Sequence, residues 1–380
     1  MLQVLKSLLI LPFLLSLCMT AKGVAPGFYV WQRKHTPELL KAVKDFASAN
    51  SNEMLFLAAE IENNGKIITV TPPDLPASRM TAVVRIHIKN ISTPPVQLAG
   101  IIVRSVKPWL NAGCSKLQID LDAPESKLRY YADLISSLRR QLPQGTLISA
   151  TVLPCHLRHT KTFALLAAGC NYFVLQIHGA VRTPEGKISL MDLNTALAAV
   201  TTARRYGRIF KVAIPCYAHR SKSGLAAPVW QDVVRVVKKC NDLQIPILIF
   251  RFGHQADGYA LDLANALLLA GGALPYRQIT AKLKPGKDGE FFLEAANRGF
   301  FSKNVILQCR FPKDVVIEDF DTIGNCLPLV PGSPDKLFLR LMPPGSSSRI
   351  MWLRGRNLNE TTNIEIKIIS HPAKKGNHIQ

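Results

Sequence analysis

The sequence is poor in charged residues, and acidic residues are the scarcer kind. Charged residues make up 19% of the 380 residues, with 26 Asp and Glu against 47 Lys and Arg. An apolar share of 48% excludes an intrinsically disordered chain. The composition also excludes a collagen-like repeat and a coiled coil. The sequence therefore predicts a globular protein, and its length is sufficient for two domains.

Beyond its N-terminus the sequence has no uninterrupted apolar run of the ~18 residues that a membrane-spanning helix needs. At the N-terminus, Lys6 precedes a short apolar stretch over residues 7–19. One positive charge before such a stretch is typical of a secretory signal peptide. Residues 1–24 are therefore predicted to be a signal peptide, and the mature protein is predicted to be soluble and exported, to the periplasm or the medium. Residues 15–18 resemble a bacterial lipobox, so a lipid anchor on Cys18 stays open as an alternative.

Cysteine pairs with the spacing of metal or redox sites are also absent. No CxxC occurs, so neither a zinc site nor a thioredoxin-type site is expected, and no metal or cofactor is predicted. Export would permit disulfides, but an odd number of cysteines leaves at least one unpaired. Most of these cysteines are predicted to be small core residues. The seven beyond residue 18 are Cys114, Cys155, Cys170, Cys216, Cys240, Cys309 and Cys326.

The excess of basic residues gives a formal net charge of +21. Such a charge predicts attraction to anionic material: nucleic acid, lipid headgroups or wall polymers. The alternative is a solvated basic surface with no single partner. The sequence has no zinc-finger spacing, RNA-recognition motif or arginine-rich arm, so no specific nucleic-acid partner is expected.

Strand-like and helix-like segments alternate over residues 25–275. Eight strands are predicted, at 27–33, 54–62, 82–89, 116–122, 147–153, 172–178, 210–215 and 245–252. Helical patterns separate most of them, at 36–49, 96–110, 125–141, 192–206, 229–241 and 259–269. Eight strands with intervening helices over about 250 residues predict an α/β fold, the (β/α)8 barrel of TIM type.

Polar and apolar residues alternate inside several of these strands. Because alternate residues of a barrel strand face the axis and the surrounding helices, Asp120 and Asp122 are predicted to face the axis. The second strand is interpreted in the same way, with Leu55 and Leu57 toward the helices and Glu60 toward the axis. An open sheet covered on both faces would show continuous apolar runs instead. The polar side chains gather toward the C-terminal strand ends, where barrel enzymes build their sites.

Residues 276–380 show a different pattern. Six short strands separated by Pro, Gly and Ser turns are predicted, at 291–295, 305–310, 315–319, 337–341, 350–353 and 364–369. Six strands in about 100 residues predict a β-sandwich domain after the barrel. Its role could be packing, glycan binding or attachment to a surface.

Three segments together resemble a bacterial family of uncharacterised exported proteins, known only as a domain of unknown function. They are residues 28–33 (FYVWQR), 117–124 (LQIDLDAP) and 176–179 (QIHG). The resemblance covers the predicted barrel. It implies export and a barrel like that of glycoside hydrolases, and it implies no established activity.

A more distant similarity is to chitinase-type glycoside hydrolases, which carry Asp-x-Asp-x-Glu at the end of the fourth barrel strand. This chain has Asp120-x-Asp122-x-x-Glu125 on its fourth predicted strand. Glu125 comes one residue late and follows Pro124, at a predicted helix start. A chitinase mechanism is therefore not implied by this motif alone.

The two aspartates are the leading catalytic candidates. Their Cα atoms should lie roughly 6.7 Å apart on one strand face. Two carboxylates in a confined space resist joint ionisation, so one can act as an acid. A glycosidase needs a second carboxyl group about 5–9.5 Å away, which Glu60 or Glu125 could supply. The alternative is an internal salt-bridge network of these acids with the four basic residues Arg85, His87, Lys89 and Arg251.

Seven residues are predicted to bind substrate. Trp31 and Tyr217 lie near strand ends and could stack on sugar faces or belong to the core. His87 and His178 are predicted to form hydrogen bonds rather than to bind a metal, because their strands are not adjacent. Adjacent Cys155 and His156 point to opposite faces, which argues against a Cys/His nucleophile. The other five predicted binding residues are Arg85, His87, Gln176, His178 and Arg251.

The leading functional prediction is an exported glycoside-hydrolase-like protein that acts on a polysaccharide or envelope glycan through carboxylates at the barrel mouth. The alternative is a non-catalytic barrel that binds a glycan or an anionic envelope polymer. A second carboxylate facing Asp122 across an open cleft would favour the enzyme. Carboxylates that are all paired with Arg or Lys would favour binding.

Overall fold

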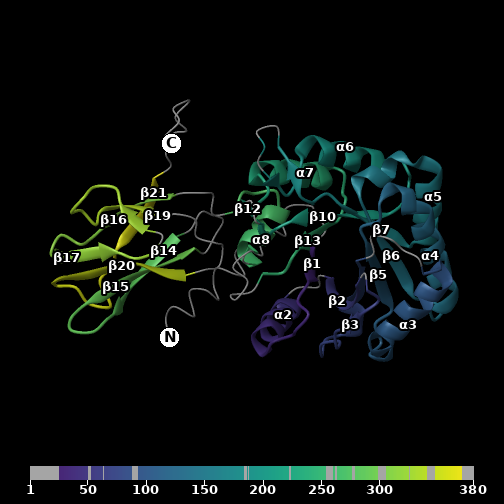
Figure 1. Ribbon diagram of the computed structural model, residues 1–380, viewed down its shortest axis with the longest axis horizontal. Helices are drawn as coiled ribbons and strands as arrows, with labels where there is room; N and C mark the ends of the chain where they lie inside the picture. Colours follow the sequence, from purple (N-terminus) through teal and green to yellow (C-terminus); the bar gives the residue numbers. More distant parts are fainter. Residues whose placement is uncertain are drawn as a thin grey trace. The chain divides into compact units, whose positions relative to one another are not determined.

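A computed structural model describes the fold (Figure 1). The predicted signal peptide, including Cys18, lies outside the described residues. One compact unit runs to Phe252 and takes in Ala266–Leu274, and a second contains Gly253–Asn265 and the chain from Pro275. The described residues are 25–49, 53–62, 64–87, 93–183, 186, 188–221, 224–253, 260–261, 263–275, 279–297, 305–324, 326–339 and 347–369.

The first unit contains a closed barrel of eight parallel strands. Each strand pairs with the next one in the sequence, and β1 pairs with the last strand to close the ring. This order is that of a (β/α)8 barrel, so the predicted fold class is confirmed. The strands are β1 (Gly27–Val30), β2 (Met54–Ile61), β4 (Met80–Ile86), β5 (Lys116–Leu121), β6 (Leu147–Val152), β7 (Tyr172–Gln176), β10 (Phe210–Pro215) and β13 (Ile247–Phe250).

Helices surround these strands (Figure 1). In α4 the buried positions Leu128, Tyr131, Ile135 and Leu138 recur every three or four residues, which gives the helix one apolar face against the sheet. α5 was not predicted, because apolar residues occupy most of its faces and leave no clear stripe. The helices are α2 (Pro37–Ala49), α3 (Pro95–Asn111), α4 (Leu128–Gln141), α5 (Thr160–Gly169), α6 (Leu193–Arg204), α7 (Trp230–Asp242) and α8 (Leu263–Ala270).

Short elements decorate the barrel. β3 (Ile67–Thr69) pairs antiparallel with the C-terminal end of β2. Two small hairpins follow the barrel strands β7 and β10 in sequence: β8 (Val181–Arg182) with β9 (Ile188–Ser189), and β11 (His219–Ser221) with β12 (Gly224–Ala226). Three 3-10 turns, η1 (Ala77–Arg79), η2 (Glu125–Lys127) and η3 (Pro154–Arg158), precede β4 and follow β5 and β6.

An apolar layer fills the middle of the barrel. Six buried residues from six strands pack together there, and Leu55 is one of them. The prediction that Leu55 faces the helices is therefore wrong. The six residues are Tyr29, Leu55, Val83, Val174, Ala213 and Leu248.

A β-bulge in β2 explains the error. Leu57 is in register with Val83 and Ala59 with Val84, so β2 contains one residue more than β4 over this stretch. Leu57 thus shares the axis-facing side with Val83, contrary to the prediction. Before the bulge the odd-numbered residues Leu55 and Leu57 face the axis. The extra residue shifts the alternation by one, so beyond the bulge the even-numbered Glu60 faces the axis, as predicted.

A partly buried ion pair lies at the N-terminal end of the barrel. The Glu53 carboxylate accepts hydrogen bonds from Lys211 and from the Thr81 hydroxyl, the latter at 2.7 Å. The Lys211 ammonium also lies 4.3 Å from the centre of the Tyr172 ring. Burial alone would raise the pKa of Glu53, but Lys211, Thr81 and Lys116 together lower it.

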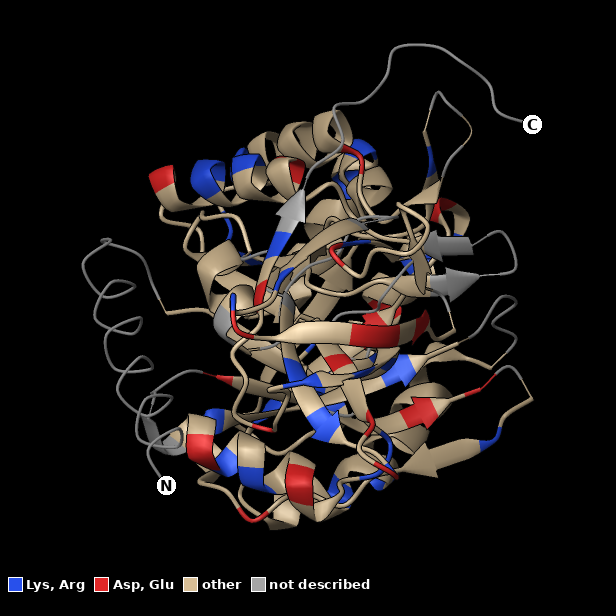
Figure 2. Ribbon diagram, turned by 90° about the vertical axis from the view of Figure 1, so that its left-hand side faces the viewer, with Lys and Arg blue, Asp and Glu red and all other residues tan. Residues whose placement is uncertain are grey.

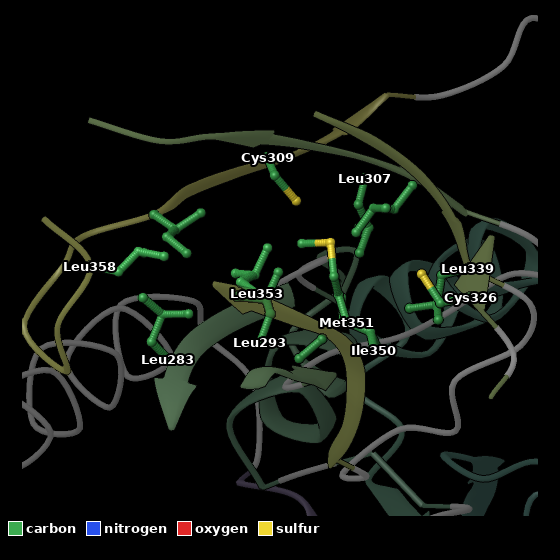
Figure 3. Close-up of a cluster of buried hydrophobic side chains, with 13 residues drawn as sticks. Leu283, Leu293, Leu307, Cys309, Cys326, Leu339, Ile350, Met351, Leu353 and Leu358 are labelled. Carbon is green, nitrogen blue, oxygen red and sulfur yellow. The ribbon is translucent and has the colours of Figure 1, made fainter. Parts of the chain in front are cut away.

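The second unit contains two four-stranded antiparallel sheets. The first has the order β14 (Ile279–Pro285), β15 (Phe291–Asn297), β20 (Ser347–Arg356) and β17 (Val316–Thr322). The second has the order β18 (Cys326–Pro328), β19 (Lys336–Leu339), β16 (Val305–Arg310) and β21 (Glu365–Ile369). Side chains from both sheets share one core (Figure 3), so the pair forms a β-sandwich. The sequence did not predict β14 or β18.

The structure also describes the cysteines, the hydropathy of the helices and the distribution of basic residues. All seven cysteines in the described ranges are free thiols and six are buried, which confirms that most are core residues. Among the helices of the described ranges, none combines the length and the hydropathy of a membrane span. Lys and Arg are spread over many helices and strands (Figure 2).

Candidate functional site

A pocket of about 680 Å³ opens where β4, β5 and β6 end. Parallel barrel strands present their C-terminal ends at one mouth, so residues far apart in sequence meet there. Five of the predicted site residues line it, Arg85 among them. The lining residues are Arg85, Ile86, His87, Asp120, Asp122, Ala123, Pro124, Glu125, Leu153 and Cys155.

Asp120 and Asp122 lie at the floor and the rim of this pocket. Asp120 is the fifth residue of β5 and is 9% exposed, whereas Asp122 follows the strand and is exposed. The Ala123 N–H donates to the Leu121 carbonyl at 2.7 Å, which closes a tight turn around Asp122. The strand thus aims one buried and one exposed carboxyl group into the same pocket.

Burial, and then the neighbouring charge of Asp122, raises the pKa of Asp120 to about 7. The Thr151 side chain and Arg85 lower it, but by less. The two carboxyl groups titrate as a pair, and at neutral pH the pair holds on to a proton that an exposed aspartate would have lost.

A hydrogen-bond chain supports the pair from inside the barrel. Gln118, two residues before Asp120 on the same strand face, donates through Nε2 to the Thr151 hydroxyl at 2.9 Å. The same amide meets the Tyr29 hydroxyl at 2.8 Å. Tyr29 and Thr151 were not predicted as site residues, because their contact with Gln118 spans 89 and 33 residues of sequence.

Glu60 lies beside the pair but is surrounded by cations. Its carboxylate is 2% exposed and accepts a hydrogen bond from Arg33 Nε. Its Oε1 lies 3.3 Å from His87 Nε2 and 3.5 Å from Arg85 Nη1. Burial alone would raise the pKa of Glu60, but Arg33, His87 and Arg85 together lower it. Glu60 is therefore ionised and paired, which makes it a poor proton donor. Arg33 was not predicted as a site residue.

Glu125 is paired as well. It belongs to η2, and its Oε1 lies 2.8 Å from Arg158 Nη2 and 3.1 Å from His159 Nε2. These hydrogen bonds, that of Arg158 first, hold the pKa of Glu125 below its ordinary value. Within the described ranges, by contrast, no Lys or Arg lies at ion-pair distance from Asp120 or Asp122. Lys89, a predicted alternative partner, lies outside those ranges.

An aromatic wall continues the mouth on the opposite strands. The Phe250 ring, at the end of β13, stacks on His178 with centroids 4.8 Å apart. Its centroid lies 5.0 Å from that of Trp31 and 5.4 Å from that of Tyr217, both edge-on. Trp31 and Tyr217 are partly exposed. Phe250 was not predicted as a site residue, since it continues an apolar strand.

Gln176 joins this wall to the acid pair. Its Nε2 lies 3.5 Å from Asp122 Oδ1 and 3.3 Å from the His178 carbonyl oxygen. Burial lowers the pKa of His178 to about 3, so its ring is neutral, and its Nε2 has no hydrogen-bond partner among the described residues. Arg251 follows Phe250 and is partly exposed.

His156 forms hydrogen bonds with the backbone next to Asp122. Its ring is fully buried, its Nδ1 accepts a hydrogen bond from the Leu153 N–H at 3.2 Å, and its Nε2 donates to the Ala123 carbonyl at 2.7 Å. The ring therefore ties the end of β6 to the turn that contains Asp122. Adjacent Cys155 lines the pocket, and burial raises the pKa of its thiol, which does not favour a thiolate nucleophile.

The site offers no metal cage. Among the residues that the structure describes, no group of three or more His, Cys, Asp or Glu side chains could hold a metal ion. The chemistry that the described side chains can perform is proton transfer from an unpaired acid pair, beside an aromatic wall and a guanidinium group.

The fold and the mouth together define a class: a (β/α)8 barrel with a partly protonated carboxyl pair at the C-terminal end of its fourth strand. Residues 77–233 match the model of a protein family described as a domain of unknown function, DUF3142. The match confirms the resemblance to a family of unknown function over that segment. It includes Asp120 and Asp122 and begins after Glu60. No curated protein matches the chain in sequence.

Solved structures with a similar fold include several glycoside hydrolases. A chitinase from Rhizomucor miehei is 14% identical over 64% of this chain and 99% of its own, with a TM-score of 0.43. The spore cortex-lytic enzyme SleL from Bacillus cereus is 11% identical over 67% of this chain and 75% of its own, at 0.43. A xylanase and alpha-amylase inhibitor protein from Scadoxus multiflorus is 12% identical over 66% and 99%, at 0.44. At these values, activity has to be inferred from the site itself.

Proposed function

We propose that the barrel hydrolyses a glycosidic bond in a polysaccharide, with the proton held by Asp120 and Asp122 going to the leaving oxygen. The carrying observation is that, among the described residues, neither Asp120 nor Asp122 forms an ion pair with a Lys or Arg, although Glu60 and Glu125 are both paired. An acid pair that keeps a proton near pH 7 is suited to general acid catalysis at that pH.

Asp122 is the group placed to contact substrate, because it is exposed at the pocket rim. In the proposed step the proton that the pair holds passes to the glycosidic oxygen as the bond to the sugar carbon breaks. The pair then carries one more negative charge, which stabilises the positive charge on the ring. Water supplies the hydroxyl group of the new reducing end, and its proton returns to the pair.

Among the described residues, no carboxylate other than Asp120 and Asp122 is free to activate the water that attacks the sugar carbon. Two-carboxylate hydrolysis needs an ionised partner that can reach the sugar carbon or its water. Glu60 is buried under three basic side chains, and Glu125 is engaged by two. The geometry therefore favours attack by water, or by a group of the substrate itself, assisted by the acid pair alone.

The aromatic wall supports a sugar as the substrate. Sugar rings present apolar C–H faces, and flat aromatic rings with one polar edge match such faces. Trp31 and Tyr217 are partly exposed beside Phe250, and Gln176 connects this wall to Asp122. A glycan lying along the wall would bring a linkage to the acid pair.

A non-catalytic glycan-binding barrel is the second candidate. The pairing of Glu60 and Glu125 favours it, because these ion pairs remove two of the carboxylates that a hydrolase could use. Both candidates share the same pocket and the same aromatic wall. They differ only in whether the acid pair transfers its proton.

The test compares the parent chain with Asp122→Asn on a panel of bacterial and plant polysaccharides, with oligosaccharide release as the readout. Asp133→Asn is the matched control, because Asp133 is an exposed acid on α4 that pairs only with Arg129 there. We expect release by the parent and the control and a loss of at least a hundredfold in Asp122→Asn. If the folded parent protein releases no oligosaccharide from any polysaccharide, the hydrolysis proposal is refuted and the non-catalytic glycan-binding barrel is favoured.

We further propose that the protein is exported through residues 1–24. The support is the sequence pattern alone: one basic residue before a short apolar stretch. N-terminal sequencing of protein from the periplasm and medium of an expressing bacterium tests it. Recovery of intact residues 1–24 on all of the protein would contradict the proposal.

A further inference from the structure

Arg85 stands in the middle of a row of charged residues at the pocket. Across three adjacent strands, Glu60 is in register with Arg85 and Arg85 with Asp120. All three side chains therefore face the barrel axis at one level. An arginine between two acids would ordinarily be explained as their shared counter-ion.

Arg85 lowers the pKa of both acids, but neither acid accepts a hydrogen bond from it among the described residues. Glu60 already accepts a hydrogen bond from Arg33 on Oε2 and lies closer to His87 than to Arg85 on Oε1, at 3.3 Å against 3.5 Å. On the other side, Asp120 is largely protonated up to about pH 7. Arg85 thus has one long contact to an already paired carboxylate and one neighbour that is often neutral.

The guanidinium of Arg85 is correspondingly unsatisfied. It carries five N–H donors, and within the described structure none of them makes a hydrogen bond. The group lies 5.7 Å from the centre of the Trp31 ring, and a third of the side chain is exposed. Its planar fork is thus held over an aromatic ring at a pocket wall, with donors available to a ligand.

A carboxylate matches such a fork best. Two parallel N–H···O bonds from one guanidinium to one carboxylate are stronger and more directional than bonds to neutral hydroxyl groups. The His87 ring also lines the pocket. A formal net charge of +21 further raises the local concentration of any polyanion.

We propose that Arg85 forms a subsite for a sugar carboxylate, so that the polysaccharide bound in this pocket is an acidic one built with uronic or other carboxylated sugars. This inference rests on the proposed function to the extent that it assigns a glycan to the pocket. It does not require that the glycan be cleaved.

Binding to paired ligands tests the subsite. Polygalacturonate, alginate, hyaluronan and xanthan are each compared with their carboxyl-reduced forms, by calorimetry with the full chain carrying Asp122→Asn. We expect at least one acidic form to bind tenfold or more tightly than its reduced form, and the preference to shrink at high salt. A panel with no such preference overturns the proposal.

Two further variants assign the preference to this residue. Arg85→Gln should bring the ratio of the two affinities close to one, and Arg85→Lys should keep part of it. Arg129→Gln removes the same charge from the exposed surface of α4 and should leave the ratio unchanged. A preference that survives Arg85→Gln overturns the proposal, as does one that Arg129→Gln removes.

The outcome is separable from that of the hydrolysis proposal. A carboxylate preference that depends on Arg85, in a protein that releases no oligosaccharide, supports the subsite and refutes hydrolysis. Oligosaccharide release that depends on Asp122 but shows equal binding of acidic and reduced forms supports hydrolysis and refutes the subsite.

Discussion

Replacing Asp120 by Asn tests the protonation of the acid pair through protein stability. The pKa of Asp120 is about 7 in the folded protein against an ordinary value of 3.8, because of burial and the charge of Asp122. Between those two values the folded protein binds a proton that the unfolded chain has released. The stability of the parent therefore falls as the pH rises through this range.

The size of the effect follows from the shift. About three pKa units at 1.36 kcal/mol each correspond to about 4 kcal/mol, as an order of magnitude. Asn has nearly the same shape as Asp and is neutral at every pH, so Asp120→Asn lacks this pH dependence. The variant should match the parent in unfolding free energy near pH 4 and exceed it by up to about 4 kcal/mol at pH 8.

Urea unfolding at pH 4, 6 and 8 measures this difference. Tryptophan fluorescence is dominated by the barrel unit, which contains Trp31, Trp109 and Trp230, whereas the second unit contains Trp352. Asp133→Asn, on an exposed helix surface, controls for the general effect of losing one acid. Asp122→Asn removes the second cause of the shift and should flatten the pH dependence in part. A gap between Asp120→Asn and the parent that stays constant from pH 4 to pH 8 would refute a protonated Asp120.

Three other substitutions have defined outcomes. Glu53→Gln breaks the partly buried pair with Lys211 and should lower the unfolding free energy by about 2 kcal/mol at pH 7 in urea titrations. Because the pKa of Glu53 is lowered, that loss should diminish as the pH falls through its folded value, opposite to the trend at Asp120. His156→Ala leaves two backbone groups beside the pocket unpaired and should cost about 2–4 kcal/mol by the same assay. Trp31→Ala should weaken glycan binding about tenfold in calorimetry, and unchanged affinity would contradict its place in the wall.

The sequence determined the barrel because its evidence is local. The two-residue period of strands and the turns between elements are properties of neighbouring residues. They were sufficient to predict eight strands in order and to place Asp120 and Asp122 on one strand face. Elements without a local signal were missed: α5 is apolar on most faces, and β18 has only three residues.

The tertiary structure decided which acids are available. Glu60 meets Arg33 across 27 residues and Glu125 meets Arg158 across 33, and no spacing rule predicts such pairs. The same holds for the bulge in β2, which turns Leu55 inward and still leaves Glu60 facing the axis. A carboxylate's charge depends on burial and on the cations that folding brings within a few ångströms. The sequence alone therefore predicted that the acids lie at the barrel mouth. Only the folded chain showed that Glu60 and Glu125 form ion pairs with arginines, whereas Asp120 and Asp122 form none among the described residues.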